Sequence, residues 1–396
     1  MRGHQSTQAM RVDAGGEQVA GRRRYVDNLK VLLIATIIGG HAVAGYSEFE
    51  FWPYAEMNEV ELSAVTQGLV MWIVGPLVLI LIPLLFLVAG LLTPRSLDRH
   101  GPGAYARGRL LRLGIPFAVY VALIQPSVMY PVHPPGGTPT SYWDEFIGAG
   151  DQTLDTGPLW FVGTLLVFSL GYAAWAALAG HHPTRRATRA LDVWRLLLLV
   201  PPVAAATYLI RVAVPFGESN EGVSLNVWEW PACLTLFVLG TVASGRGWLD
   251  EVPDREWRRA RVVALAGAVG LIAFAGMAVA LGVDADQWWG GSWHWSSFGW
   301  SFFEVLLGLF GAIWVLGSAQ RHLDRSLRGV GPSVSRSSFG AFMLQTPVLI
   351  GLAFALRPVP LPAELKALAL AVAAVVVSFG LARLLIERVP GMRRVL

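Results

Sequence analysis

Long apolar runs recur along the whole chain, and they constrain its fold more than any other feature. Ten of them come near the ~20 residues that a helix needs to cross the hydrocarbon core of a bilayer. Hydrophobic residues make up 54% of the chain and charged residues only 15%, a balance typical of multi-pass membrane proteins. The sequence therefore predicts an all-α, polytopic transmembrane helix bundle, with spans at about 27–46, 67–92, 109–130, 158–179, 194–214, 228–245, 261–282, 299–317, 338–356 and 365–386.

The charges between the runs predict how the bundle is oriented. Arginines gather at 22–24, in the loops 93–108, 180–193, 246–260 and 318–337, and in the tail, whereas the alternate loops are acidic or neutral. Because basic loops stay in the cytoplasm, both chain termini are predicted to be cytoplasmic. We expect a multi-pass protein of the cell membrane, namely the plasma membrane of a bacterium. The low charge fraction argues against binding to nucleic acid.

The ends of the chain are polar. The first residues are Gly-rich and lack the apolar core of a cleaved signal peptide. We therefore expect residues 1–21 to be a disordered cytoplasmic segment, 22–390 to be the membrane domain, and 391–396 to be a short cytoplasmic tail. The one cysteine, Cys233, excludes an intrachain disulfide. The loop histidines lack the paired spacing of a metal site, so no metal is expected.

The first apolar run carries three ionisable residues, Asp27, Lys30 and His41. At ~100° per residue, Lys30 and His41 lie within about 20° of each other around the helix, and Asp27 lies about 40° to the other side. The three residues therefore share one side of the helix. Ionisable groups are costly in lipid and usually functional, so this stripe should face protein or a water-filled cavity. The alternative is that His41 is a polar contact between helices.

A second candidate is the pair Arg109 and Arg112 at the start of the third run. Residues three apart project from neighbouring positions on one helix face. Two guanidiniums near a helix start suit a phosphate or pyrophosphate. The alternative is the ordinary excess of arginine in cytoplasmic loops.

Two further candidates are an aromatic residue at the start of one apolar run and a polar residue inside another. Trp160 follows Pro158, which suits the first turn of a helix, and it either anchors the interface or contacts a substrate. Gln345 lies in an apolar run two residues before Pro347 and needs a partner, which another helix or a substrate could supply. The outer loop 283–300 holds five tryptophans, either an interfacial belt or an aromatic platform for a sugar.

Taken in order, four stretches resemble the acyltransferase 3 family of integral membrane acyltransferases, particularly its branch of glucan-modifying succinyltransferases. The resemblance covers about Arg24 to Pro390. The stretches are YVDNLKVLLIATIIGGH, LLFLVAGLLTPRSLDRHGPGAYARGRLLRLGIP, GPLWFVGTLLVFS and FVLGTVASGRGWLDEVP.

This resemblance implies transfer of an acyl group, of the acetyl or succinyl class, from acyl-CoA to a hydroxyl of a carbohydrate, cell-surface glycan or glycosylated small molecule. Acyl-CoA would be a co-substrate, with no permanently bound cofactor. Arg109 and Arg112 would hold its nucleotide end, and His41 would be the general base, with Asp27 and Lys30 as a polar pair on the same stripe.

Trp160 and Gln345 would contact the substrate. The sequence departs from the family at two positions: the first-helix basic residue is usually arginine but is Lys30 here, and the branch often has a histidine where this chain has Gln345.

Two rival interpretations remain at this point. One is a transporter in which His41 and Asp27 relay protons, and the other is a family member that has lost catalysis. The expected partners are acyl-CoA, a carbohydrate or glycoside acceptor and the lipid bilayer, with homo-oligomerisation left open.

Overall fold

The structure, a computed structural model, describes residues 24–48, 52–132, 154–180, 192–217, 223–284, 287–288, 290–325 and 331–392. Ten of its helical segments are long and apolar enough to cross a membrane, which confirms the predicted all-α bundle and all ten spans. They are Arg24–Ala44, Ala64–His100, Pro102–Met129, Gly157–Leu178, Val193–Ala213, Val227–Ser244, Asp254–Ala280, Trp295–His322, Pro332–Leu356 and Ala363–Arg388. The predicted segment 1–21, most of the loop 131–157 and the end of the tail lie outside the described residues.

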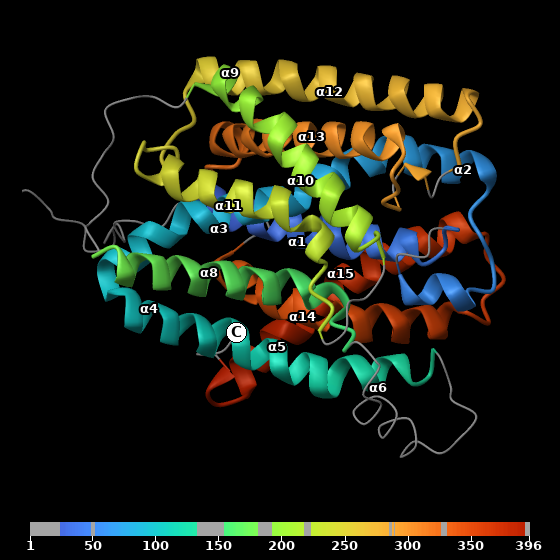
Figure 1. The fold of residues 1–396 in the computed structure, drawn as a ribbon. Helices are drawn as coiled ribbons and strands as arrows, with labels where there is room; N and C mark the ends of the chain where they lie inside the picture. Colours follow the sequence, from blue (N-terminus) through green and yellow to red (C-terminus); the bar gives the residue numbers. More distant parts are fainter. Residues whose placement is uncertain are drawn as a thin grey trace, which may run out of the picture.

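Five spans are single helices, two begin with a short 3-10 turn, and one has a 3-10 turn between two helices. They are α1 (Arg24–Ala44), η5–α8 (Gly157–Leu159, Trp160–Leu178), α9–η6–α10 (Val193–Leu196, Leu197–Leu199, Val200–Ala213), η7–α11 (Val227–Glu229, Trp230–Ser244), α12 (Asp254–Ala280), α13 (Trp295–His322), α14 (Pro332–Leu356) and α15 (Ala363–Arg388). Figure 1 shows the long helices running side by side, with α12 along one edge of the bundle and the third span along the opposite edge.

The second and third spans are interrupted by wide π turns. The second span comprises α2 (Ala64–Leu69), η2 (Val70–Val74) and α3 (Gly75–His100), and the third comprises α4 (Pro102–Arg109), η3 (Leu110–Gly114), α5 (Ile115–Val119), η4 (Tyr120–Ile124) and α6 (Gln125–Met129). Each π turn ends two residues before a proline. These prolines are Pro76, Pro116 and Pro126. Proline lacks an N–H and its ring clashes with the carbonyl four residues earlier, so the helix widens at that point.

Small residues allow the central helices to pack closely. A Cβ atom on Gly90 of α3 would overlap the carbonyl oxygen of Phe237 on α11, and one on Gly240 would overlap the carbonyl oxygen of Leu87. Backbones that approach this closely gain van der Waals contact that larger side chains would prevent. The glycine pair therefore fixes α3 against α11.

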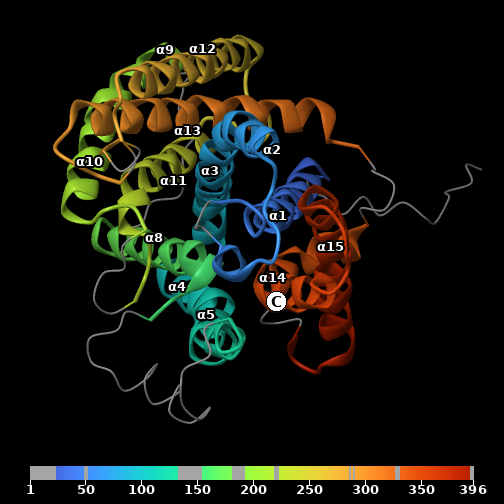
Figure 2. The same cartoon turned by 90° about the vertical axis from the view of Figure 1, so that its right-hand side faces the viewer.

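The first helix lies near the centre of the molecule. In Figure 2, α1 lies between α3 on one side and α14 and α15 on the other. It packs against α13, α14 and α15, and Ile38 and Ala42 on its inner face are fully buried. The half-buried ionisable residues of α1 therefore lie on a helix that is packed by helices from the far end of the chain.

A buried ion cluster joins three other helices. Arg211 on α10 donates two hydrogen bonds to the carboxylate of Glu304 on α13, from Nη1 at 2.6 Å and from Nη2 at 2.8 Å. The carboxylate of Glu229, just before α11, lies 3.5 Å from Nη2. The side chains of Arg211 and Glu304 are only 3% and 5% exposed, so their charges are compensated by partners within the cluster and not by water.

Candidate functional site

His41 lies in the last turn of α1, where two residues distant in sequence hold its ring. Its Nδ1 is 2.9 Å from Oε1 of Gln345 on α14. The indole of Trp52 stacks on its face, with ring centroids 4.3 Å apart and planes 13° apart. Gln345 is fully buried and Trp52 is 4% exposed, whereas His41 is half-buried. The imidazole is thus held on one edge and one face.

With the Gln345 amide oriented as in this structure, the contact indicates which ring nitrogen carries the proton. An amide carbonyl oxygen can only accept a hydrogen bond, so Nδ1 of His41 is the donor. In the neutral ring the other nitrogen, Nε2, then has a free lone pair and can accept a proton. This is the arrangement of a general base oriented by a third group.

The same helix pair is joined again near the other end of α1. The hydroxyl of Ser335, in the first turn of α14, donates to Oδ1 of Asp27 at 2.7 Å. The two contacts show that α1 and α14 run in the same direction. Asp27 and His41 therefore both face α14, and the half-buried Lys30 lies one turn beyond Asp27.

The chain after α1 folds back over its end and carries Trp52 onto His41. A Cβ on Gly45 would lie 3.3 Å from the indole of Trp52, so a small residue at this position allows the approach. The following 3-10 turn η1 (Pro53–Met57) is tied down through Glu59, whose carboxylate accepts from the hydroxyl of Tyr54 at 2.6 Å and from Nζ of Lys366 on α15 at 2.6 Å. We did not predict Trp52 as a site residue. The only sequence signal was the aromatic stretch FEFWPY in a short outer loop.

Beside Gln345, Thr346 begins a second polar chain. Its hydroxyl shares a hydrogen bond of 2.7 Å with the hydroxyl of Tyr120, which donates to Oε1 of Gln125 at 2.8 Å. Nε2 of Gln125 donates in turn to Asp155 at 2.5 Å.

Gly157 has φ of +47°, and a Cβ there would lie 2.7 Å from Oε1 of Gln125. A glycine is therefore needed before Pro158, and this network connects the GPLW motif to α14.

Arg109 and Arg112 lie on either side of the start of a π turn. Arg109 ends α4, with its guanidinium 5.0 Å from the centre of the Tyr105 ring, and Arg112 is exposed within η3. Pro116 causes this turn, because Arg112 supplies the carbonyl four residues before it. Within the described chain neither guanidinium pairs with a carboxylate, so both remain available to an anion.

Trp160, the remaining predicted residue, begins α8 and is half-buried. The described residues give it no polar or ring contact with His41 or Gln345.

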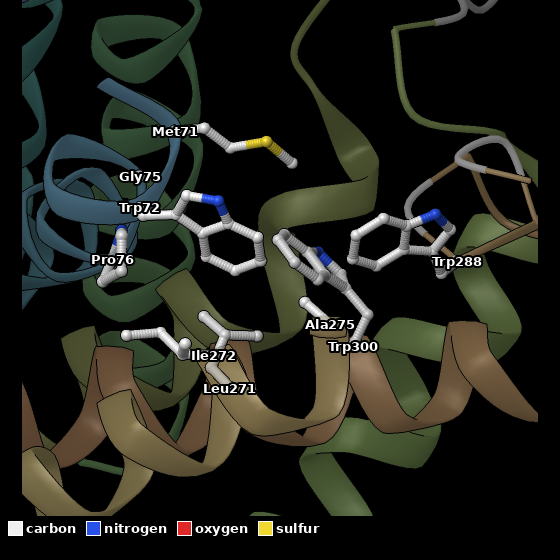
Figure 3. Close-up of a pocket in the computed structure, with 9 residues that line it drawn as sticks. All are labelled: Met71, Trp72, Gly75, Pro76, Leu271, Ile272, Ala275, Trp288 and Trp300. Atoms are coloured by element: carbon white, nitrogen blue, oxygen red, sulfur yellow. The ribbon is translucent and has the colours of Figure 1, made fainter. Parts of the chain in front are cut away.

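The tryptophan-rich segment differs in exposure from one residue to the next. Trp288 is 5% exposed, whereas Trp293 and Trp295 are 77% and 47% exposed. Trp288 and Trp300 border a small apolar pocket together with Trp72 and Ile272, between the second span and α12 (Figure 3). Among the described residues these indoles do not form one flat platform, and the pocket offers no acid, base or nucleophile.

Comparison with known proteins identifies the family. A family model described as an acyltransferase domain matches residues 23–386. No curated protein and no solved structure matches the chain. The match covers all ten spans and includes His41, Gln345, Arg109 and Arg112. The chain is therefore a multi-pass membrane protein and belongs to the acyltransferase 3 family.

Proposed function

We propose that this protein transfers an acyl group, of the acetyl or succinyl class, from acyl-CoA to a hydroxyl of a carbohydrate, cell-surface glycan or glycosylated small molecule. Membership of the family supports acyl transfer. The likeness to the glucan succinyltransferase branch, the donor, the acceptor and the plasma membrane of a bacterium as location are parts of this proposal.

One observation carries the proposal: the hydrogen bond between Nδ1 of His41 and Oε1 of Gln345 leaves Nε2 as a base. In the proposed reaction, Nε2 takes the proton of the acceptor hydroxyl while that oxygen bonds to the thioester carbon. The C–S bond then breaks, and the CoA sulfur leaves with the proton from the imidazolium. A positioned base of this kind contributes about 10²–10⁴-fold in rate.

The donor would approach from the other end of α1, which the loop charges predict to be cytoplasmic. Arg109 and Arg112 would pair with the phosphates of CoA, since both are free of carboxylate partners within the described chain. Lys30 and Asp27 would line the path of the acyl-carrying arm, and Trp160 would lie on the acceptor side.

The proton-relay alternative is weakened by distance. Asp27 and His41 are separated by fourteen residues, which is about 21 Å along a helix at 1.5 Å per residue. A proton cannot pass between them without intermediate groups, and the only ionisable side chain that α1 offers between them is Lys30, one turn from Asp27. The inactive-member alternative is weakened as well, because Gln345 contacts His41 and keeps its ring in a tautomer suited to catalysis.

Binding of acetyl-CoA and succinyl-CoA to detergent-purified protein tests the donor. Arg112→Ala should weaken binding at least several-fold, because one phosphate contact is lost. Arg99→Ala is the matched control, since Arg99 is an exposed arginine in the last turn of α3, at the same end of the second and third spans. Equal weakening in both variants would mean that only the overall positive charge matters. No binding by wild type would refute the donor assignment.

His41→Ala tests the base separately. The variant should still bind acyl-CoA but lose transfer to the acceptor by about 10²-fold or more. The two measurements separate binding from chemistry. Full turnover by His41→Ala, in a preparation that binds acyl-CoA normally, would show that another group takes the proton.

A further inference from the structure

The amide nitrogen of Gln345 is a buried donor without a partner. The residue is fully buried, and among the described residues Nε2 has no hydrogen-bond partner although Oε1 is bound to His41. A buried amide N–H that lacks a partner is destabilising and calls for a specific reason. The neighbouring residue, Thr346, does not satisfy it, because the Thr346 hydroxyl is bonded to Tyr120.

The amide of Gln345 lies at the Nδ1 edge of the His41 ring, while the base of the proposed reaction is Nε2 on the other edge. Nε2 and Oε1 of Gln345 are attached to the same planar carbon, and Oε1 is hydrogen-bonded to the imidazole edge. The amide N–H₂ group therefore lies next to His41. The acceptor oxygen must lie within hydrogen-bond reach of His41 Nε2, and the thioester carbon must lie against that oxygen. A thioester that runs along the imidazole toward α14 would turn its carbonyl oxygen to the Gln345 amide.

We propose that Gln345 has two roles in the acyl transfer. Its carbonyl orients His41, and its amide N–H₂ donates a hydrogen bond to the carbonyl oxygen of the acyl thioester. The inference deepens the proposed function and depends on it. As the acceptor oxygen bonds to the thioester carbon, negative charge develops on the carbonyl oxygen, and the Gln345 amide stabilises it until the C–S bond breaks.

Replacing the thioester carbonyl by a methylene tests the second role. Acetyl-CoA and S-ethyl-CoA differ at this position, so a hydrogen bond to the carbonyl favours acetyl-CoA. We expect wild type to bind acetyl-CoA about 3- to 10-fold more tightly than S-ethyl-CoA. Gln345→Met and Gln345→Glu should both reduce this preference to about 1, because neither a thioether nor a carboxylate can donate. A carboxylate would also repel the thioester carbonyl oxygen, so the preference in the Glu variant can fall below 1, and the uncharged Met variant decides the test.

Turnover tests the first role. Gln345→Glu keeps an acceptor for Nδ1 of His41, whereas Gln345→Met keeps none. We expect the Glu variant to transfer acyl groups faster than the Met variant, with both at least about 10²-fold below wild type in kcat. Gln125→Met is the matched control, because Gln125 is equally buried but its amide already donates to Asp155. This control should retain the preference for acetyl-CoA.

The outcomes separate the two proposals. Wild type that binds neither compound would refute the proposed donor. Equal binding of the two compounds by wild type, or a preference that survives in both Gln345 variants, would refute the amide's role and leave acyl-CoA as donor. A Met variant as active as the Glu variant would refute the orienting role.

Discussion

The buried cluster of Arg211, Glu304 and Glu229 provides a stability test in which two similar substitutions should behave differently. One guanidinium faces two carboxylates, but only Glu304 makes short bidentate hydrogen bonds. Glu229 lies 3.5 Å away and is 16% exposed. We therefore predict that Glu304→Gln destabilises the protein much more than Glu229→Gln.

The magnitudes follow from the contacts. Glu304→Gln keeps one acceptor oxygen but turns the other into an NH₂ group that faces an N–H of Arg211. A hydrogen bond to a charged group contributes about 1.5–3 kcal/mol, and loss of a buried charge partner costs about 3–5 kcal/mol. Because Glu229 still offsets the Arg211 charge, we expect about 3 kcal/mol for Glu304→Gln. Glu229→Gln removes only the second negative charge and should change stability by less than about 1 kcal/mol.

The single cysteine of the chain provides the assay. Cys233 on α11 is buried and reacts with a fluorogenic thiol dye once the bundle opens. Midpoints of thermal unfolding in one detergent, at one heating rate, should fall by about 5 °C for Glu304→Gln and by little for Glu229→Gln. Dye labelling at low temperature should stay slow in both variants, which shows that the midpoint reports unfolding of the bundle. A fall as large for Glu229→Gln as for Glu304→Gln would refute the reasoning.

Three further predictions concern other parts of the molecule. Lys30→Arg should retain activity, because the guanidinium restores the residue that the resemblance expects there; an inactive variant in the acyl-transfer assay would show that the ammonium is required. Gly240→Val should prevent correct folding, judged by the yield of monodisperse protein, since its side chain would overlap the α3 backbone, whereas Gly276→Val, with open space around it, should be tolerated. Partial burial raises the pKa of Glu59, but hydrogen bonds from Lys366 and Tyr54 outweigh it and hold the pKa below its usual value of 4.5. Its stabilising effect should therefore be complete above about pH 5 and be lost as the pH falls through the lowered pKa. A thermal-unfolding series from about pH 6 to about pH 3 should show a steeper loss for wild type than for Glu59→Gln, and parallel curves would contradict this.

The ten helices could be predicted from the sequence because the choice between lipid and water is made locally. A run of about 20 apolar residues has no other satisfactory arrangement in a bilayer, since its backbone groups must bond to each other. The same local argument identified His41 and Gln345 one at a time, as polar groups that lipid would disfavour. The observed helices extend beyond several predicted spans, as α3 does to His100, because a helix continues past the apolar residues that reveal it.

The partners of these residues were decided only by the tertiary structure. The pairing of His41 with Gln345 joins positions 304 residues apart and depends on how α1 and α14 are rotated against each other. Those rotations are fixed by packing over whole helix faces, which hydropathy does not record. Trp52 reaches His41 only because the chain folds back after Gly45. Arg211 and Glu304 meet for the same reason: each is a costly charge in its own span, and only packing of α10 against α13 brings the two charges together.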